Sequence, residues 1–188
     1  MSFKKLVVGL AGMPGAGKSL VVSVAKEMMY SVVVMGDVVR EEAAKRGLEP
    51  NPENLGRIML ELRRNEGSSV IAKRCIPKIE QVKESKVIVD GIRSLSEVEE
   101  FKKHFPSFTL IAIHSSPETR FKRLYHRQRS DDPKKWEIFY ERDMRELSVG
   151  LGEAIAMAEY LIVNEENLDV VKEKAKDVLR KVEKKWMK

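Results

Sequence analysis

Short apolar runs alternate along the chain with longer segments whose apolar residues recur every three or four positions. The short runs predict strands at residues 6–11, 31–36, 87–91, 108–114 and 160–163. The periodic segments predict helices at residues 20–29, 38–46, around 55–62, 70–85 and 94–104, several between 117 and 158, and one at 168–186. Strands of this kind alternating with helices indicate an α/β protein with a five-stranded parallel sheet sandwiched by helices.

Capping residues predict where several of these helices begin and end. Asp37 is expected to open one helix and Gly47 to end it, whereas Pro77 is expected to kink another. The other expected starts are Asn51 or Asn54, Ser94 or Ser96, and the segment Asp131-Asp132-Pro133. The last helix carries an apolar stripe typical of core packing, formed by Leu168, Val171, Ala175, Val178, Leu179, Val182 and Trp186.

Residues 12–19 form the most specific motif of the chain, a G-x-x-x-x-G-K-[ST] phosphate-binding loop between a predicted strand and a predicted helix. Its residues are Gly12, Met13, Pro14, Gly15, Ala16, Gly17, Lys18 and Ser19. The glycines let backbone N–H groups surround a phosphate, Lys18 is suited to the β/γ-phosphates and the Ser19 hydroxyl to Mg²⁺. The motif therefore predicts that the chain binds a nucleoside triphosphate with Mg²⁺.

Two other interpretations of this segment are a chance glycine-rich turn and a secretory signal, because Lys4 and Lys5 precede an apolar run. The agreement of strand, loop and helix argues against the first. Glycines and Pro14 interrupt the apolar run, which argues against the second.

The composition fits one domain spanning residues 1–188, with 43% hydrophobic and 34% charged residues. No apolar run approaches the ~20 residues of a membrane span, so we expect no membrane association. The one cysteine, Cys75, suits a reducing interior, which favours a cytoplasmic location. The net charge of +6 favours anionic partners, either nucleotide phosphates or RNA. Abundant lysine, arginine and glutamate resemble the composition of thermophile proteins.

Charged residues follow two of the predicted strands. Asp90 ends the strand at 87–91, where it can hold Mg²⁺ or simply cap the next turn, and Arg93 can bind a phosphate or pair with Glu97 at the surface. Asp37 and Arg40 repeat this arrangement after the strand at 31–36, with Asp37 also suited to plain helix capping. Two arginines at neighbouring strand ends indicate a second anionic substrate beside the triphosphate.

A basic segment lies farther along the chain. Arg120, Arg123 and Arg127 share one helix face, and with Arg142 and Arg145 they could clamp a transferring phosphoryl group. The alternatives are an RNA-binding patch or a solvated face paired with Glu141 and Glu146. The Asp131-Asp132-Pro133 segment could in addition hinge a lid over the site.

Four segments occur in the order found in adenylate kinase: residues 12–19, Gly36-Asp37-Val38-Val39-Arg40, Asp90-Gly91-Ile92-Arg93 and Arg123-Leu124-Tyr125-His126-Arg127. Asn164, directly after the last predicted strand, resembles an asparagine that helps seat the adenine in dephospho-CoA kinase. The whole chain is most similar to an archaeal family of adenylate-kinase-related phosphate-loop proteins, whose members carry similar Gly-Asp-Val-Val-Arg, Asp-Gly-Ile-Arg-Ser and Arg-Ser-Asp-Asp segments.

The resemblance implies a nucleoside-monophosphate-kinase-like fold with an acceptor-binding helical region at 38–84 and a helical lid at 116–150. It implies that ATP is bound by residues 12–19 and Asn164, Mg²⁺ by Ser19 and Asp90, and the acceptor phosphate by Asp37, Arg40 and Arg93. Lys18, Arg123, Arg127 and Arg142 would then act on the transferring phosphoryl group.

Two departures from adenylate kinase concern the acceptor. Residues 91–93 lack its Phe-Pro spacer, and Ser94-Leu95-Ser96 stands where it has the glutamine that reads AMP, which argues against AMP as acceptor. No Asn-Lys-x-Asp motif is present, so ATP is favoured over GTP as donor.

The favoured hypothesis is an ATP-dependent phosphotransferase acting on a small phosphorylated acceptor, either a nucleotide or a molecule like dephospho-CoA. The alternative is an ATPase or switch protein in an RNA or ribosome-maturation assembly, as some adenylate-kinase relatives are. Its basis is the net charge and the basic last helix, with Lys172, Lys174, Lys176, Lys181, Lys184 and Lys185. Because Glu173, Asp177 and Glu183 are interspersed there, a solvated face explains that helix better.

Overall fold

The computed structural model describes residues 5–127, 129 and 132–187. Five parallel strands form one sheet in the order β2-β3-β1-β4-β5, which confirms the expected sheet. Their bounds are Leu6–Ala11 (β1), Ser31–Val34 (β2), Lys86–Ile92 (β3), Thr109–His114 (β4) and Tyr160–Val163 (β5). The helices of the described chain are α1 Lys18–Glu27, α2 Met35–Lys45, α3 Pro52–Glu66, α4 Val70–Gln81, α5 Leu95–His104, α6 Pro117–Arg127, α7 Trp136–Ser148, α8 Leu151–Ala156 and α9 Leu168–Trp186.

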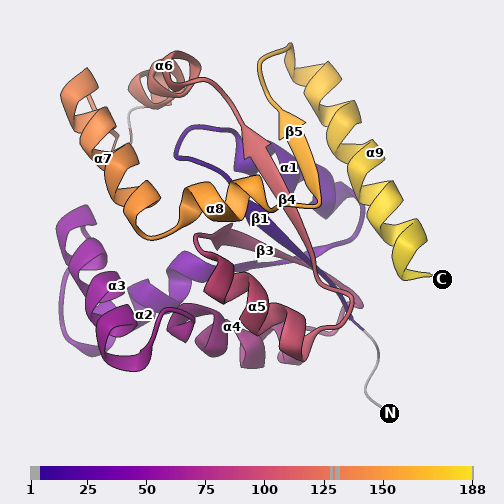
Figure 1. Ribbon diagram of the computed structural model, residues 1–188, viewed down its shortest axis with the longest axis horizontal. Coiled ribbons are helices and arrows are strands. Elements are labelled where there is room, and N and C mark those ends of the chain that lie inside the picture. The colour runs from indigo at the N-terminus through magenta and orange to yellow at the C-terminus, as the bar shows by residue number, and fades with distance from the viewer. Residues whose placement is uncertain (1–4, 128, 130–131, 188) are drawn as a thin grey trace.

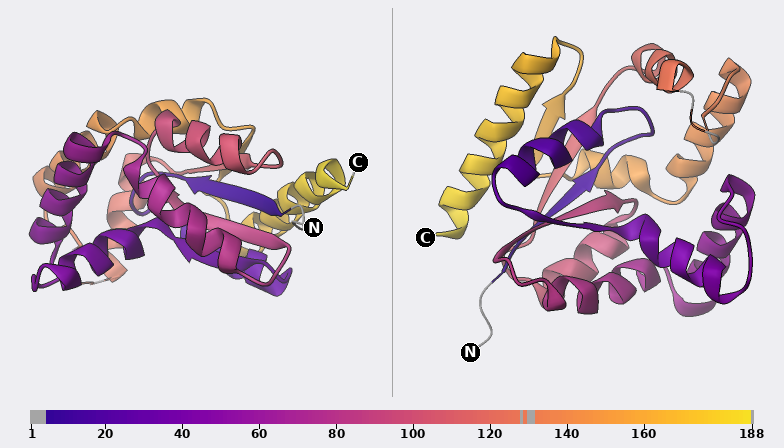
Figure 2. Two further views of the ribbon diagram at one scale, coloured as in Figure 1. Left: turned by 90° about the horizontal axis from the view of Figure 1, so that it is seen from below. Right: turned by 180° about the vertical axis from the view of Figure 1, so that it is seen from behind.

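Helices cover both faces of the sheet, because the central strands are apolar at nearly every position and successive side chains point to opposite sides. Val8 and Leu10 of β1 pack with α1 and α9, whereas Val7 and Ala11 pack with α2 to α5 and α8. The layers are visible from the side in Figure 2, and Figure 1 shows α9 beside β5 with α2, α3 and α4 at the opposite end of the sheet.

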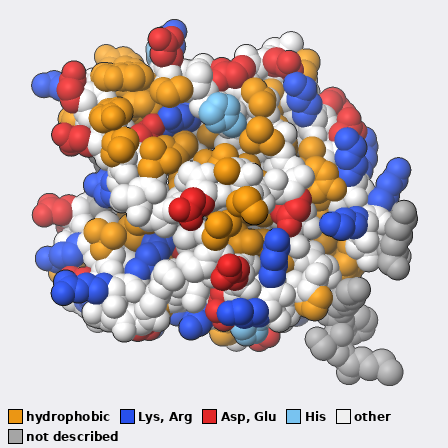
Figure 3. Space-filling model, in the orientation of Figure 1, with side chains coloured by type: hydrophobic (Ala, Val, Ile, Leu, Met, Phe, Trp, Pro, Cys, Tyr) orange, Lys and Arg blue, Asp and Glu red, His pale blue; other side chains and the backbone are white. Residues whose placement is uncertain are grey.

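Hydrophobic side chains also remain on the surface. They gather at the upper left of the face in Figure 3, where α6 and α7 lie. The exposed apolar residues of α7 are Trp136, Ile138, Tyr140, Met144 and Leu147.

Two of the expected helix caps are present in the structure. The Asn51 side chain accepts a hydrogen bond from the Asn54 backbone N–H at 2.8 Å at the start of α3, and Ser94 caps α5. Leu168 is an exception in the predicted stripe of α9, because it is 61% exposed. The helix α4 continues through Pro77 to Gln81.

Two predicted helix starts are wrong. The strand β2 ends at Val34 and α2 begins at Met35, so Asp37 lies inside the first turn, where a negative charge favours the helix dipole. The helix α7 begins at Trp136 with Lys135 at its N-cap position, three residues after the expected Pro133. Asp132 instead accepts hydrogen bonds from Arg127 and from the Arg129 backbone N–H. Asp131 lies outside the described residues.

The core on the α5 side gives a stability prediction. Phe101 is fully buried and stacks on Phe108, with ring centroids 5.5 Å apart. Truncating such a ring leaves a cavity, so Phe101→Ala should lower the free energy of unfolding by about 3–5 kcal/mol. The measurement is equilibrium denaturant unfolding, with Leu60→Ala at a 47% exposed position as the control. Equal midpoints for the two variants would contradict this account of the core.

Candidate functional site

The phosphate-binding loop connects β1 to α1 at the carboxyl edge of the sheet. Two of its glycines have positive φ, +82° at Gly15 and +100° at Gly17. A Cβ atom at Gly17 would lie 2.0 Å from Asn164 Nδ2, and one at Gly12 would lie 2.6 Å from the Ile113 carbonyl oxygen. The loop therefore needs glycine for both its backbone conformation and its close packing.

Lys18 of the loop and Asp90 at the end of β3 influence each other's charge. Lys18 Nζ donates to the Gly12 carbonyl oxygen at 2.6 Å. Burial lowers the pKa of Lys18, and the negative charge of Asp90 opposes this shift. Burial raises the pKa of Asp90, opposed by the positive charges of Lys18 and Arg93. The two side chains thus stabilise each other's charged forms.

Asp90 and Ser19 fit a magnesium ion. Asp90 Oδ1 is buried without a hydrogen-bond partner among the described residues, and Ser19 is exposed at the start of α1. Within the described chain no three His, Cys, Asp or Glu residues cluster as a metal site. Mg²⁺ commonly binds with few protein ligands and takes the rest from phosphates and water, so a carboxylate and a hydroxyl beside a phosphate-binding loop suit it.

The bulge of β3 separates Asp90 from Arg93. Leu10 of β1 pairs with Asp90 and Ala11 pairs with Ile92, so Gly91 has no opposing residue in β1. Gly91 has a φ of +107°, which glycine adopts at no steric cost. The bulge lets Asp90 stay beside Lys18 while Gly91 and Arg93 border a separate cavity.

Asn164 contacts the phosphate-binding loop through a hydrogen bond to its backbone. It is 6% exposed, and its side-chain Nδ2 donates to the Ala16 carbonyl oxygen at 2.8 Å. Its own carbonyl oxygen accepts from Ser115 Oγ at 2.7 Å and from Arg123 Nη2 at 2.9 Å. The adenine contact that the resemblance to dephospho-CoA kinase implies for Asn164 stays a prediction. The contacts of Ser115 are not predicted from the sequence, because a serine after a strand carries no specific signal.

Each of the three arginines predicted on one face of α6 has protein partners in the structure. Arg120 is buried, makes a two-pronged ion pair with Asp143 and donates to the Pro14 carbonyl oxygen at 3.1 Å. Arg127 pairs with Asp132 through two hydrogen bonds. Arg123 is held by Ser115 and Asn164. Arg120 and Arg123 thus share Ser115 as a partner, Arg127 pairs with Asp132, and the phosphoryl clamp predicted from their helical spacing stays a prediction.

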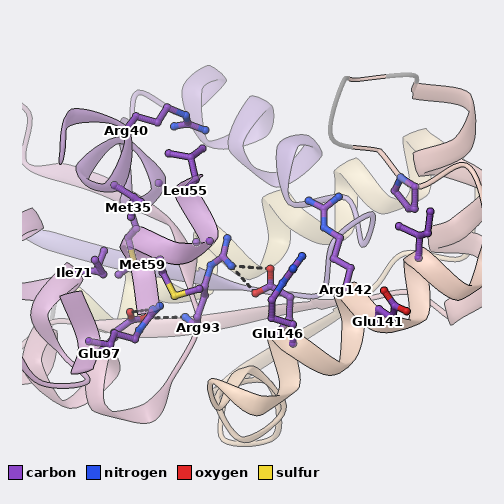
Figure 4. Close-up of a pocket in the computed structure, with 18 residues that line it drawn as sticks. Met35, Arg40, Leu55, Met59, Ile71, Arg93, Glu97, Glu141, Arg142 and Glu146 are labelled. Atoms are coloured by element: carbon purple, nitrogen blue, oxygen red, sulfur yellow. Dashed lines mark hydrogen bonds and ion pairs between the residues drawn. The ribbon is translucent and has the colours of Figure 1, made fainter. Parts of the chain in front are cut away.

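A cavity of about 420 Å³ lies between α2, α3, the end of β3 and α7. It is lined by Met35, Gly36, Val39, Arg40, Leu55, Gly56, Met59, Arg63, Ile71, Gly91, Arg93, Glu97, Pro133, Ile138, Glu141, Arg142, Arg145 and Glu146. Arg93 Nη1 bonds both carboxylate oxygens of Glu146, at 2.7 and 2.6 Å (Figure 4). Arg40, Arg93, Arg142 and Arg145, four of the arginines predicted from the sequence, therefore share one cavity.

The pairing of these arginines differs from the expected alternatives. The Arg93 guanidinium pairs with Glu146 of α7. Glu97 accepts a hydrogen bond from the Arg93 backbone N–H, and its ion-pair partner is Arg63. Arg40 pairs with Asp37 in an exposed contact. Sequence reasoning missed Arg63, although its spacing of four residues from Met59 and eight from Leu55 places all three on one face of α3.

Comparison with known proteins agrees with this architecture. A family model described as AAA domain matches residues 11–138. A UPF0200 protein from Hyperthermus butylicus is 48% identical, covering 95% of each chain, and one from Methanocaldococcus jannaschii is 49% identical, covering 94% of this chain and 90% of its own. The chain belongs to the UPF0200 family.

Solved structures show the same fold as this UPF0200 chain. A shikimate kinase from Bacteroides thetaiotaomicron has a TM-score of 0.60 at 15% identity, covering 93% of this chain and 98% of its own. A gluconokinase from Sinorhizobium meliloti has a TM-score of 0.59 at 14% identity, covering 100% and 98%. The fold is that of phosphate-loop kinases, as predicted.

Among the described residues no helix is long and apolar enough to span a membrane.

Asp90 Oδ1, buried without a hydrogen-bond partner among the described residues, leads to a prediction about Mg²⁺ binding. Asp90→Asn removes the negative charge and should raise the Mg²⁺ concentration needed for half-maximal ATP turnover by about 10- to 100-fold. The measurement is a Mg²⁺ titration of ADP formation at saturating ATP. Glu118→Gln, an exposed carboxylate of α6, is the matched control and should leave the titration unchanged. An unchanged titration for Asp90→Asn would argue against a metal role.

Proposed function

We propose that this protein is a Mg²⁺-dependent phosphotransferase that moves the γ-phosphoryl group of ATP to a small phosphorylated acceptor. The observation that carries the proposal is the arginine-lined cavity beside the phosphate-binding loop. The two sites adjoin at β3, because Asp90 pairs with Leu10 of the strand that leads into the loop and the next residue, Gly91, lines the cavity. A triphosphate on the loop would therefore face a second ligand in the cavity.

The charge of the cavity supports a phosphorylated acceptor. Five arginines and three glutamates line it, an excess of two positive charges. A phosphomonoester carries about two negative charges at neutral pH and would offset this excess. Arginine also matches phosphate geometry through its forked N–H groups.

Phosphoryl transfer asks the protein mainly for positioning and charge neutralisation. In our proposal Lys18 binds the β/γ-phosphates, Ser19 and Asp90 hold Mg²⁺, and Arg40 and Arg93 grip the acceptor phosphate. Arg93 would exchange Glu146 for that phosphate, and Arg127 would exchange Asp132 for the transferring group. Arg142 lines the cavity on the α7 side, where it can reach the same group. A nucleoside monophosphate would attack through a phosphate oxygen and require no general base, whereas a hydroxyl acceptor, as in dephospho-CoA, must give up a proton.

Arg93 provides the test of the two-substrate arrangement. Arg93→Ala should lower transfer to the acceptor by about 100-fold or more while ATP binding persists, since the lost charge acts on the acceptor side. The assay uses ATP labelled at the γ-phosphate with nucleoside monophosphates, dephospho-CoA and other small phosphates, and calorimetry measures ATP binding.

Two variants serve as controls for Arg93→Ala. Arg64→Ala removes an exposed arginine of α3 and should leave transfer unchanged, whereas Lys18→Ala should remove all ATP turnover. Labelled phosphate released without a labelled acceptor, and stimulated by RNA, would contradict the phosphotransferase and favour an RNA-linked ATPase.

A further inference from the structure

One side chain of the cavity is not explained by phosphate binding. Arg63 of α3 is 11% exposed, and its Nη2 donates to Glu97 Oε1 at 2.6 Å. Glu97 is fully buried, and its other oxygen accepts the Arg93 backbone N–H at 2.8 Å. The positive charge of Arg63 is thus already balanced by a buried carboxylate, so this pair has no need of a second anion.

The remaining donors of Arg63 are unsatisfied. Nε and Nη1, which carry three N–H groups, are buried without a hydrogen-bond partner among the described residues. Leaving buried donors unpaired is costly, and burial keeps bulk water from serving as their partner. Such donors at the wall of a ligand cavity indicate a partner that arrives with the ligand.

The surroundings of Arg63 suit a flat apolar body. Leu55 and Met59 lie on the same face of α3, and Met35 and Ile71 line the same end of the cavity. Figure 4 shows these apolar side chains on the Glu97 side, with Arg142 and Glu146 on the other side. Met59 precedes Arg63 by one helical turn, and both residues line the cavity.

The cavity lining restricts what the ligand can offer. The described lining residues include no Asn, Gln, Ser or Thr, so its side-chain hydrogen-bond donors are arginines and its side-chain acceptors are glutamates. Each fork of a guanidinium pairs Nη2 with either Nε or Nη1, so the second N–H of Nη2 and one of the unpaired donors can face two adjacent acceptors, as in guanine O6 and N7. Adenine is typically read by Asn or Gln. Cytosine also presents adjacent acceptors, O2 and N3. In uracil the N3–H donor lies between the two carbonyl oxygens. In adenine the 6-amino group lies between the acceptors N1 and N7. Neither base therefore presents two adjacent acceptors at these positions.

We propose that Arg63 determines acceptor specificity, and that the acceptor is a nucleoside monophosphate whose base presents two adjacent hydrogen-bond acceptors, GMP or CMP. The phosphate lies at the Arg93 side and the base between the apolar side chains, with its edge at Arg63. The cavity volume of about 420 Å³ is within the range of small-molecule sites. This inference rests on the proposed phosphotransferase function.

The test compares kcat/KM for GMP, CMP, AMP and UMP with ATP as donor. The wild-type protein should prefer GMP or CMP over both AMP and UMP by about tenfold or more. Arg63→Lys keeps a positive charge for Glu97 but loses the forked donors, so the preference should fall by about tenfold. Arg64→Lys is the matched control on the exposed face of α3 and should keep the preference.

The outcomes separate this inference from the proposed function. Equal use of AMP or UMP, a preference that survives Arg63→Lys, or transfer only to dephospho-CoA or another phosphate would overturn the role of Arg63 and leave the phosphotransferase standing. ATP hydrolysis without transfer to any acceptor would overturn both. Thermal unfolding reports whether Arg63→Lys is folded, and if it is not, the wild-type preference alone decides.

Discussion

The contact between the phosphate-binding loop and the residues after β4 and β5 sets the geometry of the whole site. Asn164 and Ser115 reach the Ala16 carbonyl oxygen from the ends of neighbouring strands. Gly17 leaves so little room there that even a methyl group would collide with the Asn164 amide. The loop conformation therefore depends on strand pairing in the sheet, and the start of α1, which carries Lys18 and Ser19, follows from the loop.

Carboxylates partner many of the arginines on which the proposed chemistry depends. Glu146 holds Arg93, Asp132 holds Arg127, and Asp143 holds Arg120. Ion pairs of this kind keep cationic side chains ordered without a ligand, and phosphate binding then replaces one anion by another. The Arg120 pair is different, because it is buried and also donates to Pro14, so its role is to support the loop.

The sequence predicts the fold well because its signals are local. Apolar runs locate all five strands, and the loop motif is specific by itself. The site is harder to predict, because its pairs join residues far apart in the chain. Helical spacing placed Arg120 beside Arg123 and Arg127, but only tertiary packing shows that Asp143 neutralises it. The ion pair of Arg63 with the buried Glu97 joins residues 34 positions apart, so no local sequence pattern predicts it.

The helix α7 has a further consequence. Asp143 and Glu146 are one helical turn apart, yet one binds an arginine under the phosphate-binding loop and the other binds an arginine of the cavity. A rigid-body shift of the helix would move both side chains together. In the proposed function an acceptor phosphate would replace Glu146 at Arg93, and α7 would keep its Asp143–Arg120 ion pair and its buried Phe139. The same helix therefore contacts both the arginine that supports the loop and the arginine of the cavity.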